Sequence, residues 1–130
     1  GAYWSERDLT AAPELAGAAE EALALAGWER GSVDHIELTA PFAHQLLLLA
    51  DELGLGTGSA LVERFENGTG DGPTLNVSGG WHAGSAAGVA GLAAAAHAAD
   101  RVRSGGRALV HGCTGLAAQS HAVVLLEGAA

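Results

Sequence analysis

The chain has 130 residues, of which 48% are hydrophobic and 16% charged, with a net charge of −9. This length fits one domain with its own core, and the apolar composition favours a face that meets a partner. The acidic balance without a basic stripe argues against nucleic-acid binding, and no apolar run is long enough to span a bilayer. A single cysteine excludes an internal disulfide framework and favours a reducing compartment, so we expect a cytoplasmic protein.

A helix over residues 13–26 is the first predicted element, because its apolar residues repeat at helical spacing. Thr10 is a candidate cap, and Pro13 suits a first helical turn. Gly27 is expected to end the helix.

Helices and strands alternate along the rest of the chain. A strand over residues 34–38, with Ile36 and Leu38 on one face, precedes a helix opened by Pro41 and running to about residue 53. The later expected elements are a short helix over 60–65, an extended segment over 74–77, a helix from residue 84 or 85 to 103, and strands over 107–111 and 120–127. The loop over 112–119 would then hold the cysteine. This order predicts a layered α/β domain with a mixed sheet of four to five strands, in which the last strand pairs antiparallel.

Three segments, in this order, resemble the thiolase superfamily. DHIELTAPFAHQLLLLADELGL (Asp34–Leu55) is similar to the thiolase segment that carries an Asn-Glu-Ala-Phe or His-Asp-Cys-Phe box, with Glu37 and Phe42 matching. NVSGGWHAGSAAGVAG (Asn76–Gly91) resembles the stretch Asn-x-x-Gly-Gly followed by Gly-His-Pro-x-Gly-x-Ser-Gly, with one residue deleted. GGRALVHGCTG (Gly105–Gly115) resembles the strand that leads into a Cys-x-Gly motif.

The resemblance implies the C-terminal half of a thiolase, most like the lipid-transfer or sterol-carrier-protein type. Thiolases are five-layered dimers built from two similar halves, and their nucleophilic cysteine lies in the N-terminal half. We therefore expect residues 1–130 to form one C-terminal-like domain that lacks the N-terminal half and, apart from a remnant, the first strand. The expected partners are a chain that supplies the N-terminal half, or further copies of this chain. Coenzyme A thioesters would be substrates, and no cofactor is expected.

Three residues are candidates for catalysis on the strength of the resemblance. Cys113 matches the thiolase cysteine that exchanges a proton with the acyl α-carbon, and a thiol can do this when its pKa is tuned. Ser85 stands where thiolases carry the catalytic histidine, and His82 lies close enough in sequence to replace it. The plainer alternatives are a small buried residue for Cys113, a helix cap for Ser85 and a solvated loop residue for His82.

Substrate contacts are expected from the same motifs. Thr39 and Ala40 replace the polar pair that orients a water in thiolases, and of the two only Thr39 can hold one. The expected substrate-binding residues are Thr39, Phe42, Asn76, Gly79, Gly80, Gly84 and Gly115. Trp81 suits either a pocket or an interface.

The six histidines carry less information. His111 and His121 are expected to be hydrogen-bonded strand residues, and no histidine has the spacing of a metal site, so we expect none.

Two classes of function remain open. One is the C-terminal part of a thiolase-like acyl-CoA enzyme that transfers acyl groups or cleaves carbon–carbon bonds with an N-terminal-half partner. The other is a non-catalytic subunit that binds acyl-CoA or completes an interface, which the substitutions at the Thr39, Ala40 and Ser85 positions favour. A nucleotide-binding reading rests only on a glycine-rich helix start whose spacing is not GxGxxG.

Overall fold

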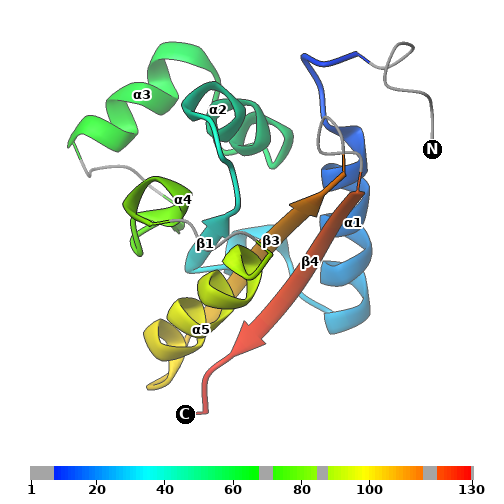
Figure 1. Ribbon diagram of the computed structural model, residues 1–130. Coiled ribbons are helices and arrows are strands. Elements are labelled where there is room, and N and C mark those ends of the chain that lie inside the picture. Colours follow the sequence, from blue (N-terminus) through cyan, green and yellow to red (C-terminus); the bar gives the residue numbers. More distant parts are fainter. Residues whose placement is uncertain (1–7, 68–71, 85–87, 116–119, 130) are drawn as a thin grey trace.

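The computed structural model describes residues 8–67, 72–84, 88–115 and 120–129. Within them, β1 (His35–Leu38), β2 (Thr74–Leu75), β3 (Arg107–Thr114) and β4 (Ser120–Glu127) form a sheet in the order β2-β1-β3-β4 (Figure 1). β1 is parallel to both β2 and β3, whereas β3 and β4 are antiparallel. The predicted mixed sheet with an antiparallel last strand is confirmed.

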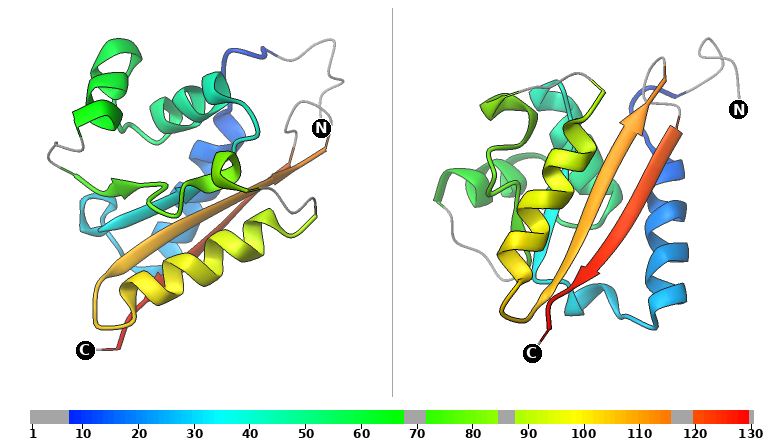
Figure 2. Two further views of the ribbon diagram at one scale, coloured as in Figure 1. Left: turned by 60° about the vertical axis from the view of Figure 1, so that its left-hand side comes forward. Right: turned by 60° about the horizontal axis from the view of Figure 1, so that its bottom comes forward.

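Helices cover both faces of this sheet. They are α1 (Pro13–Ala26), α2 (Ala43–Glu52), α3 (Gly58–Asn67), the single turn α4 (Gly80–Ala83) and α5 (Ala90–Val102), with a short 3-10 turn at Arg30–Ser32. The two views of Figure 2 show α1 on one side of β3 and β4 and α5 on the other. The chain is therefore a layered α/β unit, and β1 lies in its middle with all four residues buried.

Two apolar clusters correspond to the two faces. The larger cluster joins Leu15 and Leu23 of α1 to Leu49 of α2 and to Ile36 and Leu38 of β1. The smaller cluster packs α5 on β3, and its buried members are Ala98, Val102, Ala108 and Val110. Because the α5 side of this cluster is mostly alanine, its helix contributes short side chains and leaves hollows beside the sheet.

The first helix ends where expected but is not capped as expected. Gly27 adopts a left-handed conformation (φ 67°) and its N–H bonds back to the last turn, which confirms it as the stop. Thr10 is not the cap, because the helix begins only at Pro13 and the Thr10 hydroxyl donates to Asp8 instead. The carboxylate of Glu52 in α2 accepts the N–H of Ala12 at 2.7 Å, so a tertiary contact replaces the local cap.

Other boundaries also differ from the sequence predictions: α3 is longer than the expected helix over 60–65, and β2 is shorter than the expected segment over 74–77. The second helix begins at Ala43, two residues after Pro41. The predicted helix over 84–103 begins at Ala90, after α4 and after Gly88, whose φ of 82° is incompatible with a helix. Cys113 lies within β3, not in a loop, because pairing with β4 continues to Thr114.

Candidate functional site

The ends of β1 and β3 bring together two of the predicted site residues. Thr39 directly follows β1, and its N–H and hydroxyl both donate to the carbonyl oxygen of His111, at 3.3 and 2.8 Å. The Cys113 thiol in turn donates to the carbonyl oxygen of Thr39 at 3.3 Å. These bonds extend the parallel pairing of the two strands past β1 and hold the thiol beside the Thr39 backbone.

Cys113 lines a groove of about 560 Å³ between α5 and the ends of β3 and β4, which we call the Cys113 groove. Thr39, Trp81, Gly112, Leu92 and Val124 are among its other lining residues, and none of the lining residues is acidic or basic apart from His121. Burial raises the pKa of the Cys113 thiol. At neutral pH this group is therefore a protonated thiol, suited to giving a proton.

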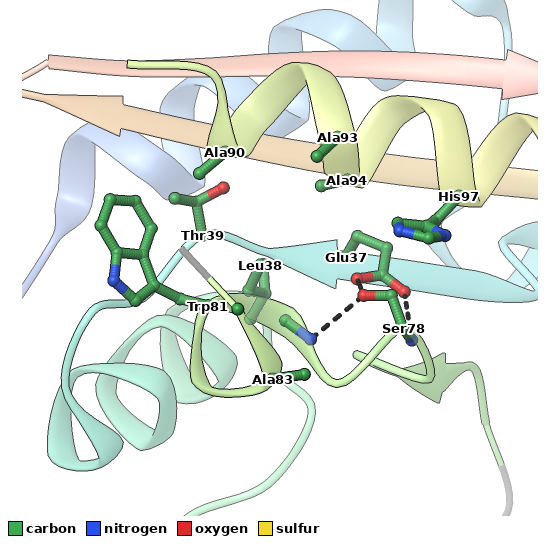
Figure 3. A pocket seen from close by; sticks show the side chains of 12 residues that line it. Glu37, Leu38, Thr39, Ser78, Trp81, Ala83, Ala90, Ala93, Ala94 and His97 are labelled. Atoms are coloured by element: carbon green, nitrogen blue, oxygen red, sulfur yellow. Dashed lines mark hydrogen bonds between the residues drawn. The ribbon is translucent and has the colours of Figure 1, made fainter. Parts of the chain in front are cut away.

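A second hollow of about 410 Å³, the Glu37 cavity, lies between β1, α4 and α5. Figure 3 shows Trp81 and Thr39 at one end of it and Glu37, Ser78 and His97 at the other. Thr39 and Trp81 line both hollows. The two spaces therefore adjoin at this pair.

Glu37 is the centre of a buried polar network. Its side chain is 1% exposed, yet it accepts the Ser78 hydroxyl at 2.5 Å, the Ser78 N–H at 3.2 Å and His35 Nε2 at 3.2 Å. The opposite nitrogen of His35 lies 2.5 Å from the Thr74 hydroxyl. Burial acts to raise the pKa of Glu37, but the hydrogen bonds from His35 and Ser78 outweigh it, so the net shift is downward. A carboxylate satisfied in this way stays ionised inside the protein.

Sequence reasoning did not predict the Glu37 network, although it matched Glu37 to the thiolase pattern. The signal was present, because His35 and Glu37 alternate with apolar Ile36 and Leu38 and so point to one face of the strand. The alternation does not show what covers that face. In the structure α5 and the turn around Ser78 cover it, and both polar residues are buried.

Asn76 and the paired glycines shape the turn that carries Ser78. The Asn76 side chain accepts the Leu38 N–H at 2.6 Å and donates to the Leu38 carbonyl at 3.1 Å, so it binds the end of β1 on both sides. Gly79 and Gly80 both have positive φ, at 86° and 57°. A Cβ on Gly80 would lie 2.7 Å from Asn76 Nδ2, and one on Gly79 would collide with Ala83. Asn76, Gly79 and Gly80 therefore fix the backbone conformation of the turn.

The other predicted site residues that the structure describes do not gather at one place. Phe42 is 61% exposed and stacks on His44, and neither it nor the exposed His82 lines the groove or the cavity. Gly84 lines the Glu37 cavity, whereas Gly115 lines neither space. Ser85 lies outside the described residues.

A histidine pair lies beside Cys113 on the last two strands. His111 Nε2 and His121 Nδ1 are 2.9 Å apart and the rings stack, with centroids at 5.1 Å. His111 is fully buried, and burial together with the charge of His121 lowers its pKa to about 3. The pair is hydrogen-bonded across the strands, as expected for both residues.

Two further observations concern the described part of the chain. No cluster of three or more His, Cys, Asp or Glu there is arranged to hold a metal ion. None of the helices in those residues combines the length and apolar character that crossing a membrane requires.

Comparison with protein families identifies the class. The family model described as "Thiolase C-terminal domain-like" matches residues 2–127, almost the whole chain. The chain therefore belongs to this family, and its α/β fold with an antiparallel last strand agrees with that membership. Among curated proteins, none matches the chain.

Proposed function

We propose that the chain is the C-terminal part of a thiolase-like enzyme that acts on acyl-CoA thioesters together with a chain supplying the N-terminal half. The observation that supports this most is the position of Cys113, whose thiol lies in an uncharged groove and is held by the Thr39 backbone. A lipid-transfer-type variant suits the chain best, because Thr39 and Ala40 replace the usual polar pair.

In the proposed reaction Cys113 exchanges a proton with the α-carbon of the acyl group. A thiol with a raised pKa is the proton-donating form, so it would protonate the carbanion left by carbon–carbon cleavage and become a thiolate. The Thr39 hydroxyl already donates to His111, so it offers a bound water or thioester only its acceptor side. Because this chemistry needs a free thiol, a reducing compartment such as the cytoplasm suits it.

The partner would cover the face formed by α5 and β4. Leu92 and Val124 are 72% and 48% exposed there, beside the Cys113 groove. Although the chain has a net charge of −9, no aspartate or glutamate is among the residues that line this groove. Apolar, uncharged surfaces of this kind favour a protein interface.

The test is to purify the native particle from its source, identify every chain in it, and assay it with acyl-CoA thioesters. We expect a second chain with a thiolase-type nucleophilic cysteine, and turnover that Cys113→Ala abolishes without dissociating the particle. Ser104→Ala, an exposed change outside both hollows, is the matched control and should leave turnover unchanged. Full turnover in the Cys113→Ala particle would refute the catalytic role.

The second candidate is a non-catalytic acyl-CoA-binding or scaffolding subunit. It is favoured by Ala40, which is 2% exposed and offers no polar side chain where thiolases orient a water. A particle that contains only copies of this chain, binds acyl-CoA and does not turn it over would support this candidate.

A further inference from the structure

We propose that the Glu37 cavity receives the distal part of the acyl chain, and that it favours chains carrying a hydroxyl or amine there over chains that end in a carboxylate. This rests on the proposed function, since it assumes that the thioester itself occupies the Cys113 groove. To that proposed function it adds the class of acyl chain that the enzyme would accept.

The first step is the continuity of the two hollows. Thr39 and Trp81 line both, so an acyl chain that starts near Cys113 meets the Glu37 cavity as it passes this pair. Trp81 is the second residue of α4, and the helix starts with two positive-φ glycines, Gly79 as its N-cap and Gly80 as its first residue. An indole at this point gives an acyl chain a flat apolar surface to pass.

The second step is the apolar wall. Ala90, Ala93 and Ala94 of α5 line the cavity together with Leu38 of β1 (Figure 3). Larger side chains at these helical positions would fill the space. The volume of about 410 Å³ therefore exists because α5 presents short side chains, and it suits methylene groups.

The third step is the polar end. Three donors reach the Glu37 carboxylate, which leaves one of its roughly four acceptor positions open. The Ser78 hydroxyl donates to Glu37 and accepts the Gly80 N–H at 3.1 Å, so it too keeps an acceptor position. Both residues line the cavity. A ligand group that donates a hydrogen bond is therefore matched at this end.

The fourth step is charge. Among the residues that line the cavity there is no arginine or lysine, and His97 is the only basic type. A carboxylate brought to Glu37 would meet a like charge on a side chain that is itself buried. Chains ending in a carboxylate should therefore be rejected, while hydroxyl and amine ends are accepted.

The experiment measures binding by calorimetry, using the chain in its native assembly and four thioesters. The probes are acetyl-CoA, octanoyl-CoA, omega-hydroxyoctanoyl-CoA and suberyl-CoA, the last ending in a carboxylate. We expect octanoyl-CoA to bind more tightly than acetyl-CoA, by about fourfold for each methylene that becomes buried. The hydroxylated probe should bind at least as well as octanoyl-CoA, and suberyl-CoA should bind roughly tenfold or more weakly than either.

The outcomes separate this inference from the proposed function. If acetyl-CoA binds but the longer chains gain nothing, or if suberyl-CoA equals the hydroxylated probe, the cavity assignment is overturned and the proposed function stands. If none of the four thioesters binds, both are overturned.

Two matched substitutions on α5 test the location. Ala93→Leu puts a larger side chain into the cavity, whereas Ala99→Leu makes the same change at an exposed position outside both hollows. Ala93→Leu should remove the gain from chain length and leave acetyl-CoA binding unchanged, and Ala99→Leu should keep both. Retention of the gain by a folded Ala93→Leu protein would overturn the assignment.

Glu37→Gln tests the charge. It should reduce the discrimination against suberyl-CoA by about tenfold, because the like charge is removed. Should this variant fail to fold, the comparison of the three long probes on the unaltered chain still decides the point.

Discussion

The Cys113 thiol donates a hydrogen bond to the carbonyl oxygen of Thr39, over 3.3 Å and across 74 positions of sequence. The bond joins the end of β3 to the residue after β1, which lie in two of the three segments that resemble thiolases. It stabilises the protonated thiol over the thiolate, because a carbonyl accepts from S–H and offers nothing to S⁻.

Alkylation of Cys113 should be slow at neutral pH. Burial raises the pKa of the thiol, and only the thiolate reacts with iodoacetamide. We expect the native protein to react more slowly than a cysteine peptide at pH 7 and the urea-unfolded chain to match the peptide, measured by mass spectrometry. Native reactivity equal to that of the peptide would contradict a buried, protonated thiol.

His111 should make the protein less stable as the pH falls. Its pKa is about 3 in the native state against an ordinary 6.5, so below pH 6.5 the unfolded chain binds a proton that the native chain does not. The contribution is fully present above pH 6.5 and is lost toward pH 3, with a slope of about 1.4 kcal/mol per pH unit. Urea unfolding between pH 7.5 and 5 measures this slope.

The control for that experiment uses two histidine substitutions. His111→Phe removes the proton-binding ring and should flatten the slope between pH 6.5 and 5. His97→Asn changes an exposed histidine and leaves His111 in place, so the slope should persist. An unchanged slope in a folded His111→Phe protein would assign the effect to other groups.

Removal of the Glu37 side chain should be strongly destabilising. Glu37→Ala leaves Ser78 and His35 without their buried acceptor and opens a void, which together cost about 2–4 kcal/mol. Glu21→Ala, at an exposed position of α1, should change the free energy of unfolding by less than about 0.5 kcal/mol. Denaturant unfolding compares the two, and equal effects would refute a structural role for the network.

Two glycine-to-alanine changes should act in opposite directions. Gly80→Ala puts a methyl group 2.7 Å from Asn76 Nδ2 at a φ of 57°, so we expect a loss of about 1–3 kcal/mol. Gly17→Ala, inside α1 with open space around it, should stabilise by about 0.5–1 kcal/mol. Thermal unfolding gives both signs in one experiment, and stabilisation by Gly80→Ala would contradict the turn geometry.

Local patterns in the sequence were enough to predict the α/β class, the first helix and the antiparallel last strand. Helical periodicity and Gly27 predicted α1 correctly, and the short connection after β3 predicted its antiparallel pairing with β4. These features depend on neighbours in sequence. The cap of α1 was predicted wrongly because the group that bonds Ala12 is Glu52, 40 positions away.

The candidate site depended on contacts that sequence reasoning could not place. Thr39 and Cys113 were each identified from motifs, but their direct contact follows from the β1–β3 pairing. The burial of Glu37 follows from the coverage of its face by α5 and the Ser78 turn, which no local pattern encodes. Long-range packing thus decided which of the motif residues lie together.

The side-chain amide of Asn76 stands in for a peptide unit that the main chain does not supply. By pairing with both backbone groups of Leu38 it adds a rung to the sheet, while its own backbone, at a φ of 47°, already turns away. The backbone can therefore change direction at Asn76 while the backbone groups of Leu38 remain hydrogen-bonded. Aspartate has no donor for the Leu38 carbonyl and glutamine is one methylene longer, so neither can imitate the peptide in this position. Asn76 consequently keeps both backbone groups of Leu38 paired at the point where the chain enters the turn that carries Ser78.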